Sequence, residues 1–131
     1  MRLLLDTHVA LWAITDDASL SRRALELIAE PANQVTISAA TLWEIGIKYR
    51  LARKGQGRMP ISAAEALGYF QASGYDLLAI SPAHAVAAAD LPALHADPFD
   101  RMLVAQSLEE PLRLLTHDAL VAAYSDSIIQ V

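Results

Sequence analysis

Four acidic residues stand where their side chains could act together on one reaction. They are Asp6, Glu44, Asp100 and Asp118, and each lies just after a predicted strand or in the first turns of a predicted helix. The carboxyl ends of parallel strands meet at one edge of a sheet, which is the usual ligand crevice of such folds. We therefore expect the four carboxylates to converge there, with Asp97 as a fifth acid nearby.

Ionised carboxylates at one edge of a sheet need a positive partner. Two of them about 5 Å apart repel by roughly 3 kcal/mol at an effective dielectric constant near 20. Either protons or divalent cations must relieve that repulsion. The sequence has no cysteine and no pair of histidines one helical turn apart, and oxygen ligands favour Mg²⁺ or Mn²⁺ over Zn²⁺. The pattern therefore predicts a magnesium or manganese site.

Each acid also has a purely structural interpretation, because Asp is common at helix N-termini as a cap and as a partner of the helix dipole. Capping is the favoured role for Asp97, which precedes a proline. For Asp118 and Asp100 the structural and functional roles remain equally open. A solvated position is harder to assign to Glu44, which has bulky apolar neighbours, and to Asp6, which ends a strand expected to be buried.

The elements that must position these acids can be read from apolar periodicity and turn residues. Five short runs are typical of strands: 2–5, 35–38, 77–80, 112–116 and 128–131. Helices are expected between them, at about 9–14, 19–28, 41–52, 62–73, from 82, 98–109 and 118–124. Strands that alternate with helices predict an α/β fold, a mainly parallel sheet with helices on both faces.

Length and composition limit the organisation of the chain. Its 131 residues predict one domain, residues 1–131, with one core. A hydrophobic fraction of 54% suggests an apolar face for self-association or a partner. The net charge of −5 equals the charge of the five acids above, so the rest of the chain is neutral on balance.

Half of the ten Lys and Arg residues fall within eleven positions, and they are Lys48, Arg50, Arg53, Lys54 and Arg58. A cluster of this kind is either a solvated helix end or a set of phosphate contacts for RNA. The sequence leaves these two alternatives open.

The chain carries no sign of export or membrane insertion. The apolar run at its N-terminus is interrupted by Asp6, and no apolar stretch reaches the eighteen or so residues that span a bilayer. Without cysteine there is also no disulfide framework. We expect a cytoplasmic protein that does not bind membranes.

Four segments in order along the chain form a recognisable pattern, and they are LLLDTHV from residue 3, SAATLWEI from residue 38, HADPFDRMLVAQ from residue 95 and LTHDA from residue 115. Together they resemble the PIN-domain family, in particular the VapC-type toxins of toxin–antitoxin systems. The likeness covers nearly the whole chain. One departure is Ala96, where relatives often carry a basic residue.

The resemblance implies a three-layer α/β/α fold whose metal site matches Asp6, Glu44, Asp100 and Asp118, with Thr116 as an orienting hydroxyl. It also implies endonucleolytic cleavage of RNA with Mg²⁺ or Mn²⁺, a homodimer, and an antitoxin partner that inserts a segment near the active site. Cleavage by a metal-held water would give 5′-phosphate and 3′-hydroxyl ends.

Several other side chains have alternative interpretations. Among the histidines, His8, His84, His95 and His117 follow no nucleophile or metal-ligand spacing, and we assign them no catalytic role. Both Trp12 and Trp43 are expected in the core rather than stacked on bases. We expect Arg101 to hold a carboxylate in place.

Three other functions compete with the nuclease. An aspartyl-phosphate phosphatase expects a second Asp two residues after the first, where this chain has His8, and a receiver domain expects a late lysine, whereas the last lysine is Lys54. A binding module that does not cut RNA remains the alternative, although the presence of all four acids argues against it.

Overall fold

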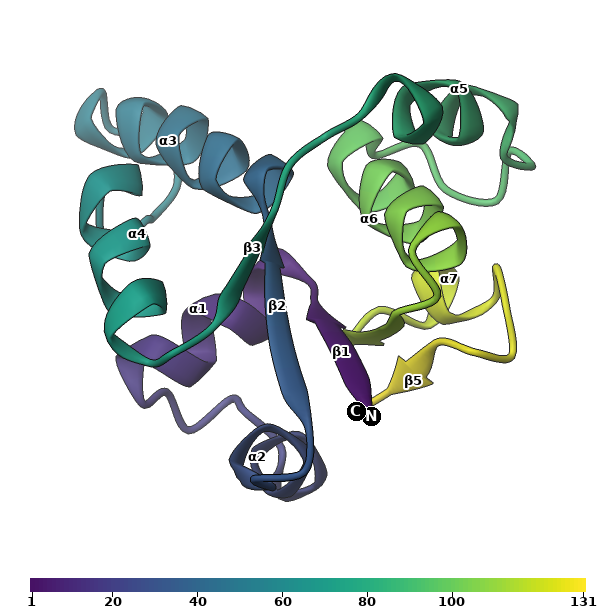
Figure 1. The fold of residues 1–131 in the computed structure, drawn as a ribbon. Helices are drawn as coiled ribbons and strands as arrows, with labels where there is room; N and C mark the ends of the chain where they lie inside the picture. Colours follow the sequence, from purple (N-terminus) through teal and green to yellow (C-terminus); the bar gives the residue numbers. More distant parts are fainter.

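The computed structural model describes residues 1–131 and contains one sheet of five parallel strands (Figure 1). The strands are β1 (Arg2–Leu5), β2 (Gln34–Ser38), β3 (Asp76–Leu78), β4 (Arg113–Thr116) and β5 (Ile129–Gln130). The helices are α1 (Thr7–Thr15), α2 (Arg22–Ala29), α3 (Ala39–Arg53), α4 (Ala63–Ala72), α5 (Pro82–Asp90), α6 (Pro98–Glu109) and α7 (Ala119–Ala122). The expected α/β class with a parallel sheet is confirmed.

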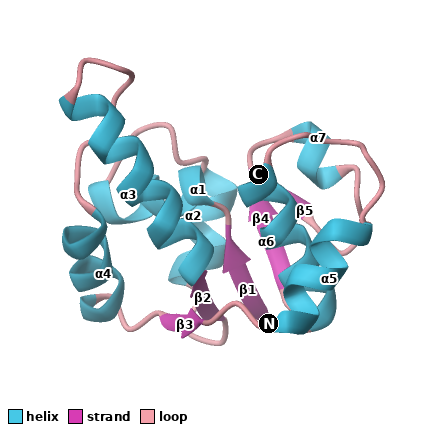
Figure 2. Cartoon of the chain, turned by 90° about the horizontal axis from the view of Figure 1, so that it is seen from above, coloured by secondary structure: helices cyan, strands magenta, loops and turns pink.

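Alternation along the buried strands divides the core into two layers. In β1, Leu3 and Leu5 pack in one cluster with side chains of α1, α2 and α4, whereas Leu4 packs in the other with side chains of α6 and α7. Successive side chains of a strand point to opposite faces of the sheet, so both faces must be covered. Figures 1 and 2 show helices on both sides of the strands, which makes this a three-layer α/β/α fold.

In the strand order β3-β2-β1-β4-β5, the side on which successive strands are added changes between β1 and β4. From β1 the chain builds outward through β2 and β3, then crosses to the other side of β1 to add β4 and β5. Ligands of open α/β sheets bind at such a switch point, outside the carboxyl ends of the strands. At this switch point the carboxyl ends of β1 and β4 are joined by a hydrogen bond of 3.0 Å from the Asp6 amide to the Leu115 carbonyl.

The start of α3 differs from the expectation that Thr41 opens this helix. The helix begins at Ala39, because Ser38 ends β2 with extended backbone angles and its side chain accepts a hydrogen bond from the Ala40 amide at 3.0 Å. One serine thus terminates the strand and caps the helix. As a result Thr41 lies inside the helix and is fully buried.

Two other elements are shorter than predicted, β3 and α7. Strand β3 covers 76–78 rather than 77–80 because it pairs only with β2, and its last partner is Ser38, the end of that strand. Helix α7 ends at Ala122 rather than near residue 124. Ser62 and Ser81 are the N-caps of α4 and α5. None of the helices has the length and apolar character that crossing a membrane requires.

Candidate active site

Asp6 lies at the switch point, one residue beyond β1, and its two carboxylate oxygens have different partners. Oδ1 accepts a hydrogen bond from the Val9 amide at 2.9 Å and so caps α1, while Oδ2 accepts one from the Thr116 hydroxyl at 2.6 Å. Only 5% of the residue is exposed, and this burial raises the pKa of Asp6, although both hydrogen bonds oppose the shift. The two hydrogen bonds hold the carboxylate in place, and its burial disfavours the ionised form.

Thr116 connects two of the predicted acids. Its hydroxyl donates to Asp6 and accepts a hydrogen bond of 3.0 Å from the Asp118 amide. The residue is fully buried at the end of β4. The position of Thr116 is therefore consistent with the orienting role that the resemblance implies, and the acid whose side chain it contacts is Asp6.

Glu44 is buried on α3, with 3% of its surface exposed. Its Oε1 accepts a hydrogen bond from Thr7 at 2.6 Å, and its Oε2 is paired with the ammonium group of Lys48, one helical turn away. Thr7 directly follows Asp6, so the Glu44 carboxylate lies beside the switch point. Each of its oxygens keeps a second lone pair with which it could bind a cation.

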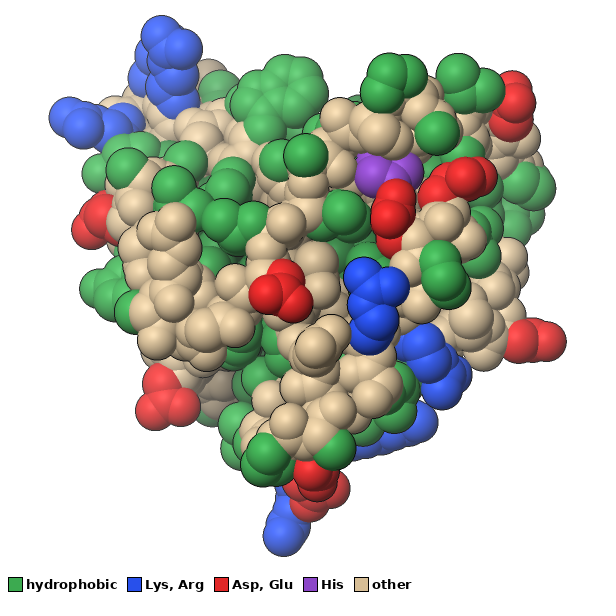
Figure 3. Space-filling model, viewed as in Figure 1, with side chains coloured by type: hydrophobic (Ala, Val, Ile, Leu, Met, Phe, Trp, Pro, Cys, Tyr) green, Lys and Arg blue, Asp and Glu red, His purple; other side chains and the backbone are tan.

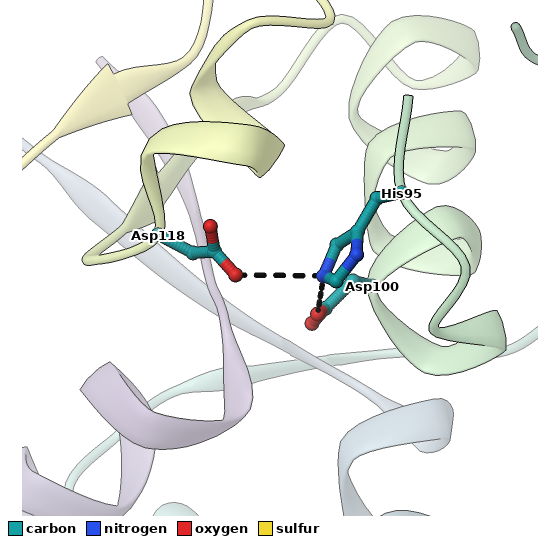
Figure 4. A group of neighbouring side chains, drawn as sticks. All are labelled: His95, Asp100 and Asp118. Carbon is teal, nitrogen blue, oxygen red and sulfur yellow. Dashed lines mark hydrogen bonds and ion pairs between the residues drawn. The ribbon is translucent and has the colours of Figure 1, made fainter. Parts of the chain in front are cut away.

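Asp100 and Asp118 approach each other from the other side of the crevice, with His95 between them (Figure 4). His95 Nε2 lies 2.8 Å from Oδ2 of Asp100 and 3.4 Å from Oδ2 of Asp118. One ligand atom from each of the three residues lies within 4.8 Å of the other two. Ligand atoms at such separations are compatible with a shared metal ion.

His95 was not assigned to the site from the sequence. Its Nδ1 accepts a hydrogen bond of 3.1 Å from the Ala96 amide, so the proton of the neutral ring lies on Nε2, which donates to Asp100. No periodic spacing distinguishes His95, because it lies in the irregular segment between α5 and α6. Only its place five residues before Asp100 within the family-like motif pointed to the site.

Asp97 has the structural role favoured for it. Its Oδ1 accepts hydrogen bonds from the amides of Phe99 at 2.8 Å and Asp100 at 3.0 Å, and it is the N-cap of α6. Its charge nevertheless acts on the site. Burial, followed by the negative charge of Asp97, raises the pKa of Asp100 to about 6, against the hydrogen bond from His95; the charges of Asp6 and Glu44 contribute further.

The closeness of the carboxylates bears on whether these residues could hold a divalent cation. Asp100 senses the negative charge of Asp97, Asp6 and Glu44, so carboxylates from distant parts of the sequence lie close enough to repel one another. Carboxylate oxygens form a donor set that suits Mg²⁺ or Mn²⁺. The residues therefore fit such an ion: Asp100 and Asp118 have ligand atoms within 4.8 Å of each other, and the carboxylates of Asp6 and Glu44 lie close enough for their charges to act on Asp100.

The expectation that Arg101 holds a carboxylate is wrong. Its guanidinium donates hydrogen bonds to the carbonyls of Ala88, Leu91 and Pro92 and to the Tyr124 hydroxyl, at 2.8–3.3 Å. Five donors in a planar fork suit several carbonyls at once. Arg101 therefore fixes the end of α5 and the segment that carries His95.

Two further expectations need correction. Trp43 is 65% exposed rather than in the core, and its ring packs edge-on against Phe99 at 5.5 Å between centroids. Lys48 is partly buried and paired with Glu44. The other four predicted basic residues remain on the surface at the end of α3, where Figure 3 shows a group of Lys and Arg side chains, and they are Arg50, Arg53, Lys54 and Arg58.

The parallel sheet and the acids at its switch point define an α/β protein with a candidate metal centre. Residues 3–125 match the sequence model of the PIN domain. The chain belongs to the PIN domain family.

Two solved structures share the fold over all of this chain. A chain in the crystal structure of VapBC2 from Rickettsia felis, bound to a DNA fragment from its promoter, is 18% identical with a TM-score of 0.69, and 98% of that chain is covered. PAE2754 from Pyrobaculum aerophilum is 19% identical with a TM-score of 0.60, and 84% of it is covered. Comparison with curated protein sequences gives no match.

The raised pKa of Asp100 predicts a pH-dependent gain in stability for Asp100→Asn without metal. Since the folded pKa of about 6 exceeds the reference value of 3.8, ionisation of Asp100 costs stability as pH rises through this range. The full shift corresponds to about 3 kcal/mol. Because the side chain is 23% exposed, we expect solvent screening to reduce the gain at pH 7.5 to about 1–2 kcal/mol.

Denaturant unfolding in chelator at pH 7.5 and at pH 4 measures this effect. The variant and the wild-type chain should have nearly equal free energies of unfolding at pH 4, where Asp100 is protonated. An Asp100→Asn protein less stable than wild type at pH 7.5 would contradict the electrostatic account.

Proposed function

We propose that this chain is a metal-dependent endoribonuclease, the toxin of a type II toxin–antitoxin system, which hydrolyses RNA to 5′-phosphate and 3′-hydroxyl ends. The observation that carries the proposal is the approach of Asp6, Glu44, Asp100 and Asp118, from four separate segments, to the switch point of the sheet. Membership of the PIN domain family, whose members are generally nucleases, supports it.

In this proposal, bound Mg²⁺ or Mn²⁺ supplies a water of lowered pKa and neutralises charge on the scissile phosphate. The chain's own residues provide the geometry. Thr116 holds Oδ2 of Asp6, Thr7 and Lys48 hold Glu44, and His95 keeps the carboxylates of Asp100 and Asp118 facing each other. Positioning of this kind limits the reorganisation needed when RNA binds.

The basic end of α3 is proposed to bind the RNA backbone. Arg50 and Arg53 are exposed in the last turn of α3, the helix that carries Glu44, and Lys54 and Arg58 are exposed just beyond its end. Contacts to phosphates orient nucleic acid without reading its sequence, and they weaken as salt rises. An acidic protein can bind RNA in this way where its basic residues form a local cluster.

Association with an antitoxin and with a second copy of the chain is part of the proposal. An apolar hollow of about 230 Å³ lies beside the site and is lined by Ala40, Trp43, Ile80, Pro98, Phe99 and Met102. Exposed apolar surface of this kind is typical of an interaction face. The likeness to a chain of VapBC2 supports a partner of the antitoxin type.

The first test is metal dependence. Purified protein incubated with a panel of defined RNAs should cut in Mg²⁺ or Mn²⁺ and not in excess chelator. Asp6→Asn should lower the rate by at least about 100-fold, because a metal-holding charge is lost, while the amide can still cap α1. Thermal unfolding checks that the variant is folded.

The matched control is Asp126→Asn, which removes an equal charge from an exposed residue that has no part in the proposed site. It should cut at the wild-type rate. Full cleavage in chelator would overturn the proposal, and RNA binding without any cleavage in either metal would favour the non-catalytic module.

The ends of the products give a second, independent test. When a metal-held water is the nucleophile, the 2′-hydroxyl of the RNA is not consumed, so fragments should carry 5′-phosphate and 3′-hydroxyl ends. A substrate with a single 2′-deoxy residue at the cut should still be cleaved. End-labelling and mass spectrometry decide this, and a 2′,3′-cyclic phosphate as the primary product would refute the mechanism.

The third test concerns the oligomer. Light scattering at micromolar concentration should give twice the monomer mass of 14.2 kDa. Trp43→Glu should shift the protein towards monomer because it places a charge on the apolar hollow. Tyr69→Glu, at an aromatic residue that is 51% exposed on α4, is the control. A wild-type monomer would contradict the proposed dimer.

A further inference from the structure

Three aromatic rings form a cluster beside the acids, and none of them has a part in the proposed metal site. His8 and Trp12 lie one helical turn apart on α1, with their rings stacked at 5.7 Å between centroids and 25° between planes. His117, in the turn between β4 and α7, meets Trp12 edge-on at 5.5 Å. Two segments distant in sequence thus build one group of rings.

The ring cluster of His8, Trp12 and His117 flanks the carboxylate of Asp6. The charge of His8 lowers the pKa of Asp6, as does a hydrogen bond from the backbone of His117, so both histidines lie next to that side chain. His117 also directly precedes Asp118 in the sequence. A nucleotide whose phosphate reached the acids would have its base within reach of these rings.

The exposure of the rings argues against a purely structural role. His8 and His117 are exposed, and Trp12 is half-buried between them. A tryptophan that only filled the core would not need two exposed imidazoles against it. His8 is exposed while its ring contacts Trp12, so an accessible ring is already supported by a neighbour.

We infer that His8, supported by Trp12 and His117, is a stacking platform for one unpaired RNA base next to the scissile phosphate. The inference rests on the proposed function and adds a substrate-positioning group to it. Proteins recognise single-stranded RNA largely by stacking splayed bases on aromatic side chains. Stacking contributes about 1–3 kcal/mol per base, which corresponds to roughly 5- to 150-fold in affinity.

The test measures binding in chelator, apart from cleavage. Fluorescence anisotropy of a labelled single-stranded RNA should show about 5- to 150-fold weaker binding by His8→Ala. His8→Phe, which keeps a ring but no charge, should bind within about twofold of wild type. Tyr69→Ala, at the exposed aromatic of α4, should bind as wild type does. Thermal unfolding confirms that each variant is folded.

A second arm identifies stacking itself. RNAs with one abasic position, moved along the strand, should include one that weakens wild-type binding and leaves binding by His8→Ala unchanged. In a Trp43→Phe background Trp12 is the only tryptophan, and RNA should quench its emission. Equal loss in His8→Ala and His8→Phe would show that charge matters rather than stacking, and would overturn the inference.

The outcomes separate this inference from the proposed function. If the wild-type protein binds and cleaves RNA while His8→Ala does so equally well, the platform is wrong and the nuclease stands. If the wild-type protein neither binds nor cleaves any RNA of the panel, both are wrong.

Discussion

The constraint on which this structure depends is the concentration of negative charge at the carboxyl edge of the sheet. Asp6 is almost fully buried there, and Asp100 lies close enough to Asp97, Asp6 and Glu44 for their charges to act on its pKa. These charges are close together and need compensation.

Neighbouring groups compensate part of this charge. A hydroxyl and a backbone amide donate to Asp6, and the ammonium group of Lys48 pairs with Glu44. The Nε2–H of His95 donates to Asp100. Buried charge is tolerated only when it is paired or hydrogen-bonded in this way, and the arrangement leaves the acids close together rather than dispersed.

An acid can cap a helix and also face the candidate site, so the two interpretations that the sequence presents as alternatives are compatible. A carboxylate has two oxygens, and in Asp6 and Asp118 the two are used differently. Oδ1 of Asp6 caps α1, and Oδ1 of Asp118 caps α7 by accepting from the Leu120 amide at 2.8 Å. Oδ2 of each residue faces the site instead, towards Thr116 and His95 respectively. A cap fixes the side-chain rotamer and so aims the second oxygen. Helices that begin at the carboxyl ends of parallel strands therefore supply both the fold and the orientation of the acids.

Local patterns were enough to predict the parallel α/β sheet and its helices, because these depend on alternation, periodicity and residues adjacent in sequence. Side-chain partners distant in sequence were not predictable. Arg101 is next to Asp100 in the sequence, yet α6 points its guanidinium at the end of α5. His95 lies outside any regular element, so no periodicity marks it as a neighbour of Asp118. Trp43 looked like a core residue by type alone, and only the packing of α3 against α6 decides that its ring faces solvent.

The same charge distribution constrains how an anionic substrate could approach. A phosphate that enters a crevice of carboxylates is repelled until a cation lies between them. Attraction must therefore come from elsewhere on the surface, and the proposals above assign it to two features. The basic end of α3 would offer long-range attraction that salt screens, whereas the rings at His8 and Trp12 would offer short-range contacts that salt affects little. Each would act on a different part of a nucleotide, the phosphate in one case and the base in the other. In the proposed nuclease this division would allow a chain with a net charge of −5 to hold RNA without neutralising the acids of its candidate metal site.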